Sequence, residues 1–161
     1  MRKLLSVLLL AMFAVTVSAQ NGRDIYNKYS DEDGVSAVYI SKSMFRLIGK
    51  LPDVKMNDND VNLSELVNSL DGFYLIECSS ASIRKALKDD VEKYAKSNDF
   101  ELLMETKSDD ETVKIFIVSK GDEVKSLVML VSEVEECTFL CMDGSISRDK
   151  LDEAMALILD D

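Results

Sequence analysis

The sequence predicts an α+β fold, with a single mixed, mostly antiparallel sheet and helices packed on one of its faces. Two apolar runs, at 35–41 and 73–78, flank a stretch with helical periodicity, which is typical of a β-α-β unit. Four further runs with strand-like alternation follow, separated by short polar turns, which is typical of an antiparallel meander. Apolar stripes at helical spacing recur along the chain, and such stripes need a sheet face to bury.

The first half of the chain supplies the β-α-β unit. The expected elements begin with a short helix at 24–29, a turn at 31–34, a strand at 35–41 and a helix at 44–51. A polar loop at 53–62, a short helix at 63–70, a strand at 73–78 and a long helix at 83–94 follow. Ser41 or Ser43 can cap the second helix, which Pro52 ends. The strand at 35–41 is apolar on both faces, which predicts an interior position. The connection that follows it is long enough to place the two strands parallel.

The second half supplies the meander. Its four strands are expected at 100–106, 112–119, 124–131 and 136–142, with turns at 108–110, 121–122 and 132–133. Asp143 and Gly144 predict a turn that leads the chain out of the sheet. Ser147 can then cap a last helix, whose apolar stripe runs from Leu151 to Ile158.

The first nineteen residues have the three parts of a secretory signal peptide. Arg2 and Lys3 precede a 14-residue, largely apolar stretch, and small residues stand before Gln20. The apolar stretch is shorter than the roughly 20 residues that span a bilayer. We therefore expect a signal peptide at 1–19 and one α+β domain at 20–161. The product would be periplasmic or secreted, without stable membrane insertion. It would not be a lipoprotein, because no Cys lies near the expected cleavage point to carry the lipid.

Composition excludes several classes of function. The chain has no His, so it can hold no Ser-His-Asp triad, no Cys-His dyad and no His-ligated zinc or haem. Its 30 acidic and 19 basic residues give a net charge of −11, which disfavours nucleic acid as a partner. We expect no cofactor, no catalytic residues and no metal site, and therefore a non-enzymatic protein.

Three cysteines leave one structural question open. Cys137 and Cys141 lie four residues apart in one expected strand, about 13 Å apart, so they cannot bond each other. Cys78 could pair with either one in an oxidising compartment, or all three could be buried free thiols.

Other motifs offer alternatives to a binding function. Ser147 and Lys150 have the Ser-x-x-Lys spacing of a hydrolase, but the same spacing recurs at Ser82 and Lys85, and helix capping explains Ser147. Residues 58–62 begin like a calcium loop but lack its later Gly and Glu. A small apolar ligand could be carried in a pocket lined by methionines. These are Met104, Met129, Met142 and Met155.

The preferred interpretation is a protein that binds another envelope protein through one local surface. Basic and apolar side chains alternate where the first strand passes into a helix, on an otherwise acidic chain. The residues that we expect to form this surface are Ser41, Lys42, Met44, Phe45 and Arg46. Neither the partner nor the oligomeric state follows from the sequence.

The same region carries a resemblance to a known family. Tyr26-Asn27-Lys28-Tyr29, Gly34-Val35 and Val38-Tyr39-Ile40-Ser41-Lys42 with Met44-Phe45 resemble a Bacteroidetes family of small exported proteins, catalogued as a domain of unknown function. The resemblance covers essentially the whole mature chain. It implies no catalytic residues, because the family carries no known activity. It also implies an envelope-stress or signalling context, because the family's genes lie near extracytoplasmic-function sigma factors.

Overall fold

The computed structural model describes residues 21–48 and 63–149. Its element order is α2 (Gly22–Tyr29), β1 (Val35–Ser41), α3 (Lys42–Ile48), α4 (Leu63–Ser69), β2 (Leu70–Cys78), α5 (Ala81–Ser97), β3 (Glu101–Lys107), β4 (Glu111–Lys120), β5 (Glu123–Glu133) and β6 (Cys137–Ser147). The expected signal peptide, the polar loop at 53–62 and most of the last expected helix lie outside the described residues.

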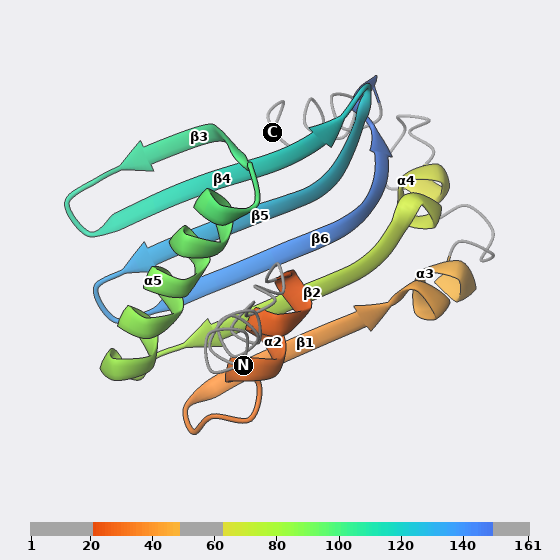
Figure 1. Ribbon diagram of the computed structural model, residues 1–161. Helices are drawn as coiled ribbons and strands as arrows, with labels where there is room; N and C mark the ends of the chain where they lie inside the picture. Colours follow the sequence, from red (N-terminus) through yellow and green to blue (C-terminus); the bar gives the residue numbers. More distant parts are fainter. Residues whose placement is uncertain (1–20, 49–62, 150–161) are drawn as a thin grey trace, which may run out of the picture.

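The strands form one six-stranded sheet in the order β1-β2-β6-β5-β4-β3, in which every neighbouring pair is antiparallel. The predicted α+β class, the single sheet and the C-terminal meander are confirmed (Figure 1). The last meander strand, β6, also pairs with β2, and this pairing joins the two halves of the chain.

The predicted parallel arrangement of the first two strands is wrong, because β1 and β2 pair antiparallel. A parallel crossover must carry the chain back along the full length of the strands. Helix α3 has seven residues and rises only about 10 Å, whereas the nine residues of β2 extend about 30 Å. Moreover, α3 contacts α4, so both helices lie at the same end of the sheet and the chain re-enters beside the strand that it left (Figure 1).

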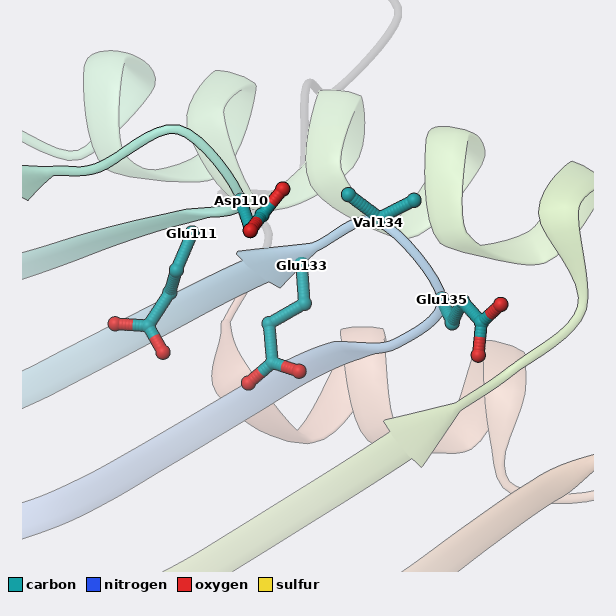
Figure 2. Close-up of a pocket in the computed structure, with 5 residues that line it drawn as sticks. All are labelled: Asp110, Glu111, Glu133, Val134 and Glu135. Atoms are coloured by element: carbon teal, nitrogen blue, oxygen red, sulfur yellow. The ribbon is translucent and has the colours of Figure 1, made fainter.

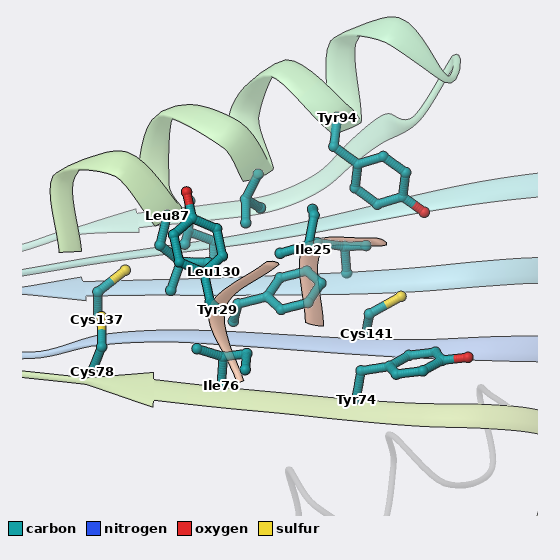
Figure 3. Packing of buried hydrophobic residues seen from close by; sticks show 13 residues of the cluster. Ile25, Tyr29, Tyr74, Ile76, Cys78, Leu87, Tyr94, Leu130, Cys137 and Cys141 are labelled. Atoms are coloured by element: carbon teal, nitrogen blue, oxygen red, sulfur yellow. The ribbon is translucent and has the colours of Figure 1, made fainter. Parts of the chain in front are cut away.

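The main core lies between one sheet face and two helices, α2 and α5. Its centre is formed by side chains with almost no exposed surface, including Ile25 of α2, Leu87 of α5 and Ile76 of β2 (Figure 3). Phe139 of β6 belongs to the same cluster and is fully buried. Helix α2 begins with a capping box, in which Asn21 and Asp24 each accept a hydrogen bond from the other's backbone N–H. The predicted packing of helices on one face holds for these two helices.

The other sheet face carries a second cluster. Its members alternate along the strands with those of the main core, as Phe73 does with Tyr74 and Leu140 with Phe139. Helix α3 contributes the buried Phe45, and α4 contributes Leu66 and Val67. The short helices therefore pack against the opposite face from α2 and α5, and of the β1 side chains Ile40 joins this second cluster.

The turn expected at Asp143 and Gly144 is absent, because β6 continues through both residues to Ser147. A Cβ at Gly144 would lie 2.4 Å from the carbonyl oxygen of Ser69, where α4 passes into β2. The glycine therefore permits close approach of two backbones rather than a turn. The turn at 121–122 is confirmed, with Gly121 at a φ of +63° between Lys120 and Glu123.

The core position of Phe139 generates the first prediction. Phe139→Ala removes a fully buried ring between both helices and the sheet, so the free energy of unfolding should fall by about 3–5 kcal/mol. Leu102→Ala, on the exposed strand β3, should change it by less than about 1 kcal/mol. Urea unfolding of both variants checks this, and equal losses at the two positions would contradict the assigned core.

Candidate interaction surface

Strand β1 lies at one edge of the sheet, although its sequence predicts an interior strand. The amide of Ser79 donates to the carbonyl oxygen of Gly34 at 3.4 Å, so Gly34 and Ser79 form a hydrogen-bonded pair. Because bonded pairs recur every second residue, Ser36, Val38 and Ile40 direct their backbone groups toward β2. Ala37 and Tyr39 direct theirs outward, where no strand of the described residues pairs with them.

The outward side of β1 lacks the features that usually protect an edge strand. Val35–Ser41 contains no charged residue and no proline, and its register with β2 is regular throughout. The opposite edge strand, β3, carries Glu101, Glu105 and Lys107, and its pairing with β4 is interrupted by a bulge. Charges and bulges discourage the addition of another strand. The two edges of this sheet therefore differ, and only β1 is free of both obstacles.

Large apolar side chains are exposed along β1 and the helix that follows it. Val38 and Tyr39 retain 41% and 40% of their surface, and Met44 and Leu47 of α3 retain 47% and 63%. Val38 points to one sheet face and Tyr39 to the other, because successive side chains alternate. An extended segment added to β1 would thus find apolar contacts on both faces.

The structure divides the five residues predicted for partner binding into supporting and exposed ones. Ser41 accepts the amide of Met44 at 3.3 Å and caps α3, so the first of the two predicted caps is confirmed. Lys42 forms an ion pair with Asp71 at the start of β2. Phe45 is 6% exposed and belongs to the second cluster, so it cannot contact a partner. Met44 and Arg46 remain exposed.

Sequence reasoning missed an aromatic cluster beside β1. The rings of Tyr39 and Tyr74 stack with centroids 5.3 Å apart, and Tyr26 of α2 lies about 6 Å from both. The guanidinium of Arg23 lies 5.5 Å from the centre of the Tyr39 ring. Each such contact contributes about 0.5–1.5 kcal/mol. The cluster holds Tyr39 in one orientation. The sequence alone could not have indicated this cluster, because the pairing of Tyr39 with Tyr74 depends on the register of β1 and β2.

A second group of polar side chains lies on the helix-covered sheet face, between β5 and β6. Ser126 donates to Asp143 at 2.7 Å, and the thiol of Cys141 donates to the same carboxylate oxygen at 3.5 Å. Burial raises the pKa of Cys141 and of Asp143. A thiol with a raised pKa is a poor nucleophile, and the two hydrogen bonds to Asp143 link β5 to β6.

The Ser-Lys and methionine alternatives gain no geometric support. Ser147 is exposed at the end of β6, whereas Lys150 and Met155 lie outside the described residues. Met104 is exposed on β3, and Met142 packs in the second cluster. Both alternatives therefore stay predictions.

One shallow pocket of about 470 Å³ opens between two hairpin turns. Figure 2 shows its lining, in which the carboxylates of Asp110, Glu111, Glu133 and Glu135 point in different directions around Val134. In the described ranges no three Asp, Glu, Cys or His residues come together as a metal site. None of the described helices is long and apolar enough to cross a membrane.

A family model described as a domain of unknown function (DUF4252) matches residues 29–154, well over half of the chain. The chain belongs to this family. The DUF4252 match runs from the end of α2 through β6, so the open edge of β1 and the α3 junction lie within the family domain. No curated protein and no solved structure matches the chain. The expected membership of a domain of unknown function is confirmed, while export and the phylum stay predictions.

Burial of Asp143 generates a pH-dependent prediction. Its pKa is raised above the ordinary 3.8, so the folded state holds the proton more tightly than the unfolded state. The native protein should therefore gain stability relative to Asp143→Asn as the pH falls from 7 toward 4. Thermal melts of both proteins across this range check the sign. A difference that is constant with pH would show that the pKa of Asp143 is not raised in the folded state.

Proposed function

We propose that this chain is an exported, non-enzymatic protein that binds an extended segment of another envelope protein along the open edge of β1. The observation that carries the proposal is the mismatch between sequence and position. Strand β1 has the uncharged, two-sided apolar composition of an interior strand, yet its outer side is unpaired among the described residues. Strand addition would give β1 the second neighbour that its composition suits.

Local chemistry supports strand addition at this edge. Ala37 and Tyr39 present backbone donors and acceptors, which would give affinity for any extended chain. Tyr39 and Val38 provide one apolar contact on each face, which would select apolar side chains at two successive positions of the partner, one on each face. Exposed Arg46 on the adjoining helix adds a positive charge, which favours an acidic residue where the partner passes α3.

Export and an envelope-stress or signalling context belong to the same proposal. They rest on the signal-like residues 1–19 and on the resemblance to exported proteins. The proposal of a non-enzymatic role rests on the lack of His in the whole chain and on the burial of Cys141, which raises the pKa of its thiol. The binding proposal itself depends only on the geometry of β1 and is tested separately from them.

Hydrogen exchange and site-specific crosslinking test the binding edge. A photoreactive residue replacing Tyr39 should crosslink one partner in the producing cells, whereas the same residue replacing Leu102 on β3 should not.

With that partner bound, the amides of Ala37 and Tyr39 should exchange at least about tenfold more slowly, because each gains a hydrogen bond. Unchanged exchange at both amides would contradict strand addition.

A matched pair of variants separates the edge from the fold. Ala37→Pro removes an outward N–H that makes no bond to β2, so it should leave the sheet folded and lower partner binding at least tenfold. Met104→Ala, on the opposite edge, should leave binding unchanged. Melting curves establish that both variants fold. If Ala37→Pro folds and still binds at full strength, the partner does not use the edge of β1.

A further inference from the structure

Two of the three cysteines lie directly opposite each other in the sheet. Cys78 is the last residue of β2, Cys137 is the first residue of β6, and the register pairs them as Cα partners. Both belong to the main core cluster, so their side chains lie on the same face of the sheet (Figure 3). They are free thiols in this structure.

The hydrogen-bond pattern sets their separation. The amide of Glu133 donates to the carbonyl oxygen of Glu136 at 2.8 Å, which pairs Glu136 with β5. The next residue, Cys137, therefore directs its backbone toward β2, and Cys78 and Cys137 form a hydrogen-bonded pair. The Cα atoms of such a pair lie about 5.5 Å apart, within the roughly 4.4–6.8 Å that a disulfide requires.

The third cysteine does not compete for the bond. Cys141 is paired with Tyr74 and lies four residues further along β6, about 13 Å from the level of Cys78. Its thiol also donates to Asp143. The register thus distinguishes between two pairings that the spacing of cysteines alone left open.

We propose that Cys78 and Cys137 form a disulfide when the chain meets a disulfide-type oxidant, and that Cys141 stays a thiol. One cysteine thiolate attacks the oxidant's disulfide, which forms a mixed disulfide and releases one oxidant thiol. The other cysteine thiolate then displaces the second oxidant thiol. The two cysteines lose two protons and two electrons in total, and the oxidant is reduced to two thiols.

Position at the strand ends makes the reaction possible despite burial. Cys78 and Cys137 are 1% and 2% exposed, so an oxidant reaches them during folding or when the sheet end opens locally. Their Cβ atoms must also approach to about 4 Å, closer than most cross-strand pairs. Exposed Ser79 and Glu136 flank the pair, so the strand ends can adjust without disturbing the core centre.

The bond would link the two halves of the fold. It would close the loop that contains α5 and strands β3 to β5, and it would fasten the β2–β6 pairing at one end. Closing a loop of this length restricts the unfolded chain strongly, so the oxidised protein should melt at a higher temperature than the reduced one. The bond lies away from the outward side of β1, so the test for the disulfide does not depend on whether a partner binds there.

Peptide mapping of the full chain tests the pairing. The chain is refolded with oxidised glutathione, free thiols are alkylated, and the protein is cleaved by chymotrypsin after Phe139 or Leu140, which separates Cys137 from Cys141. The expected result is a Cys78 peptide linked to a Cys137 peptide, with Cys141 alkylated. Linkage to Cys141, or alkylation of all three cysteines, would overturn the proposal.

Two variants keep the test decisive. Cys141→Ala should retain the linked peptides, and Cys137→Ala should lose them and leave Cys78 alkylated. Oxidation should raise the melting midpoint by at least about 5 °C in the natural sequence and in Cys141→Ala, but not in Cys137→Ala. An equal rise in Cys137→Ala would show that another pairing is responsible and would overturn the proposal.

Discussion

The pairing of β2 with β6 is the interaction on which the rest of the fold depends. Strands β3 to β6 are joined by short hairpin turns, and β1 and β2 are consecutive strands, so within each group a strand pairs with the strand that follows it in the chain. Among the strand pairs of the described sheet, only β2 and β6 join segments more than fifty residues apart. Closing that loop costs conformational entropy, which burial of Ile76, Phe139 and Leu130 beneath α2 and α5 offsets.

The helices follow from the same pairing. Helix α5 connects the two strand groups and packs over β5 and β6, where Leu87 and Val91 enter the core. Helix α2 packs beside it, and Tyr29 of α2 donates a hydrogen bond to Asp90 of α5 at 2.6 Å. Lys114 of β4 donates to Glu92 of α5 at 2.7 Å and fixes the other side of that helix. Without β2 beside β6, these contacts would have no common surface.

Periodicity predicted most of the elements because it reports burial within one element. The strand at 35–41, the stripe from Ile83 to Tyr94 and the meander were all found in this way. Periodicity says nothing about neighbouring strands, so it predicts an interior position and a parallel partner for β1, whereas the structure has an edge position and an antiparallel partner. Gly144 was interpreted as a turn because a glycine in a sequence does not distinguish a bend from a close backbone contact.

For the candidate surface too, the sequence predicts the local elements but not the contacts between distant segments. Residues 41–46 were correctly placed where a strand passes into a helix, because the composition changes there. The burial of Phe45 and the ion pair of Lys42 depend on the second cluster and on Asp71, which are distant in sequence. The Tyr26, Tyr39 and Tyr74 cluster joins three elements, so no local pattern could have shown it.

The uncharged edge of β1 also bears on how copies of this protein behave toward one another. An edge strand usually carries its own charges against unwanted pairing. Here the strand has none, and repulsion comes instead from the net charge of −11 on the whole chain. Such repulsion acts over a Debye length, which shrinks to about 8 Å at physiological ionic strength. Association of two copies through β1 is therefore opposed by the charge of the whole surface, and less strongly as the salt concentration rises.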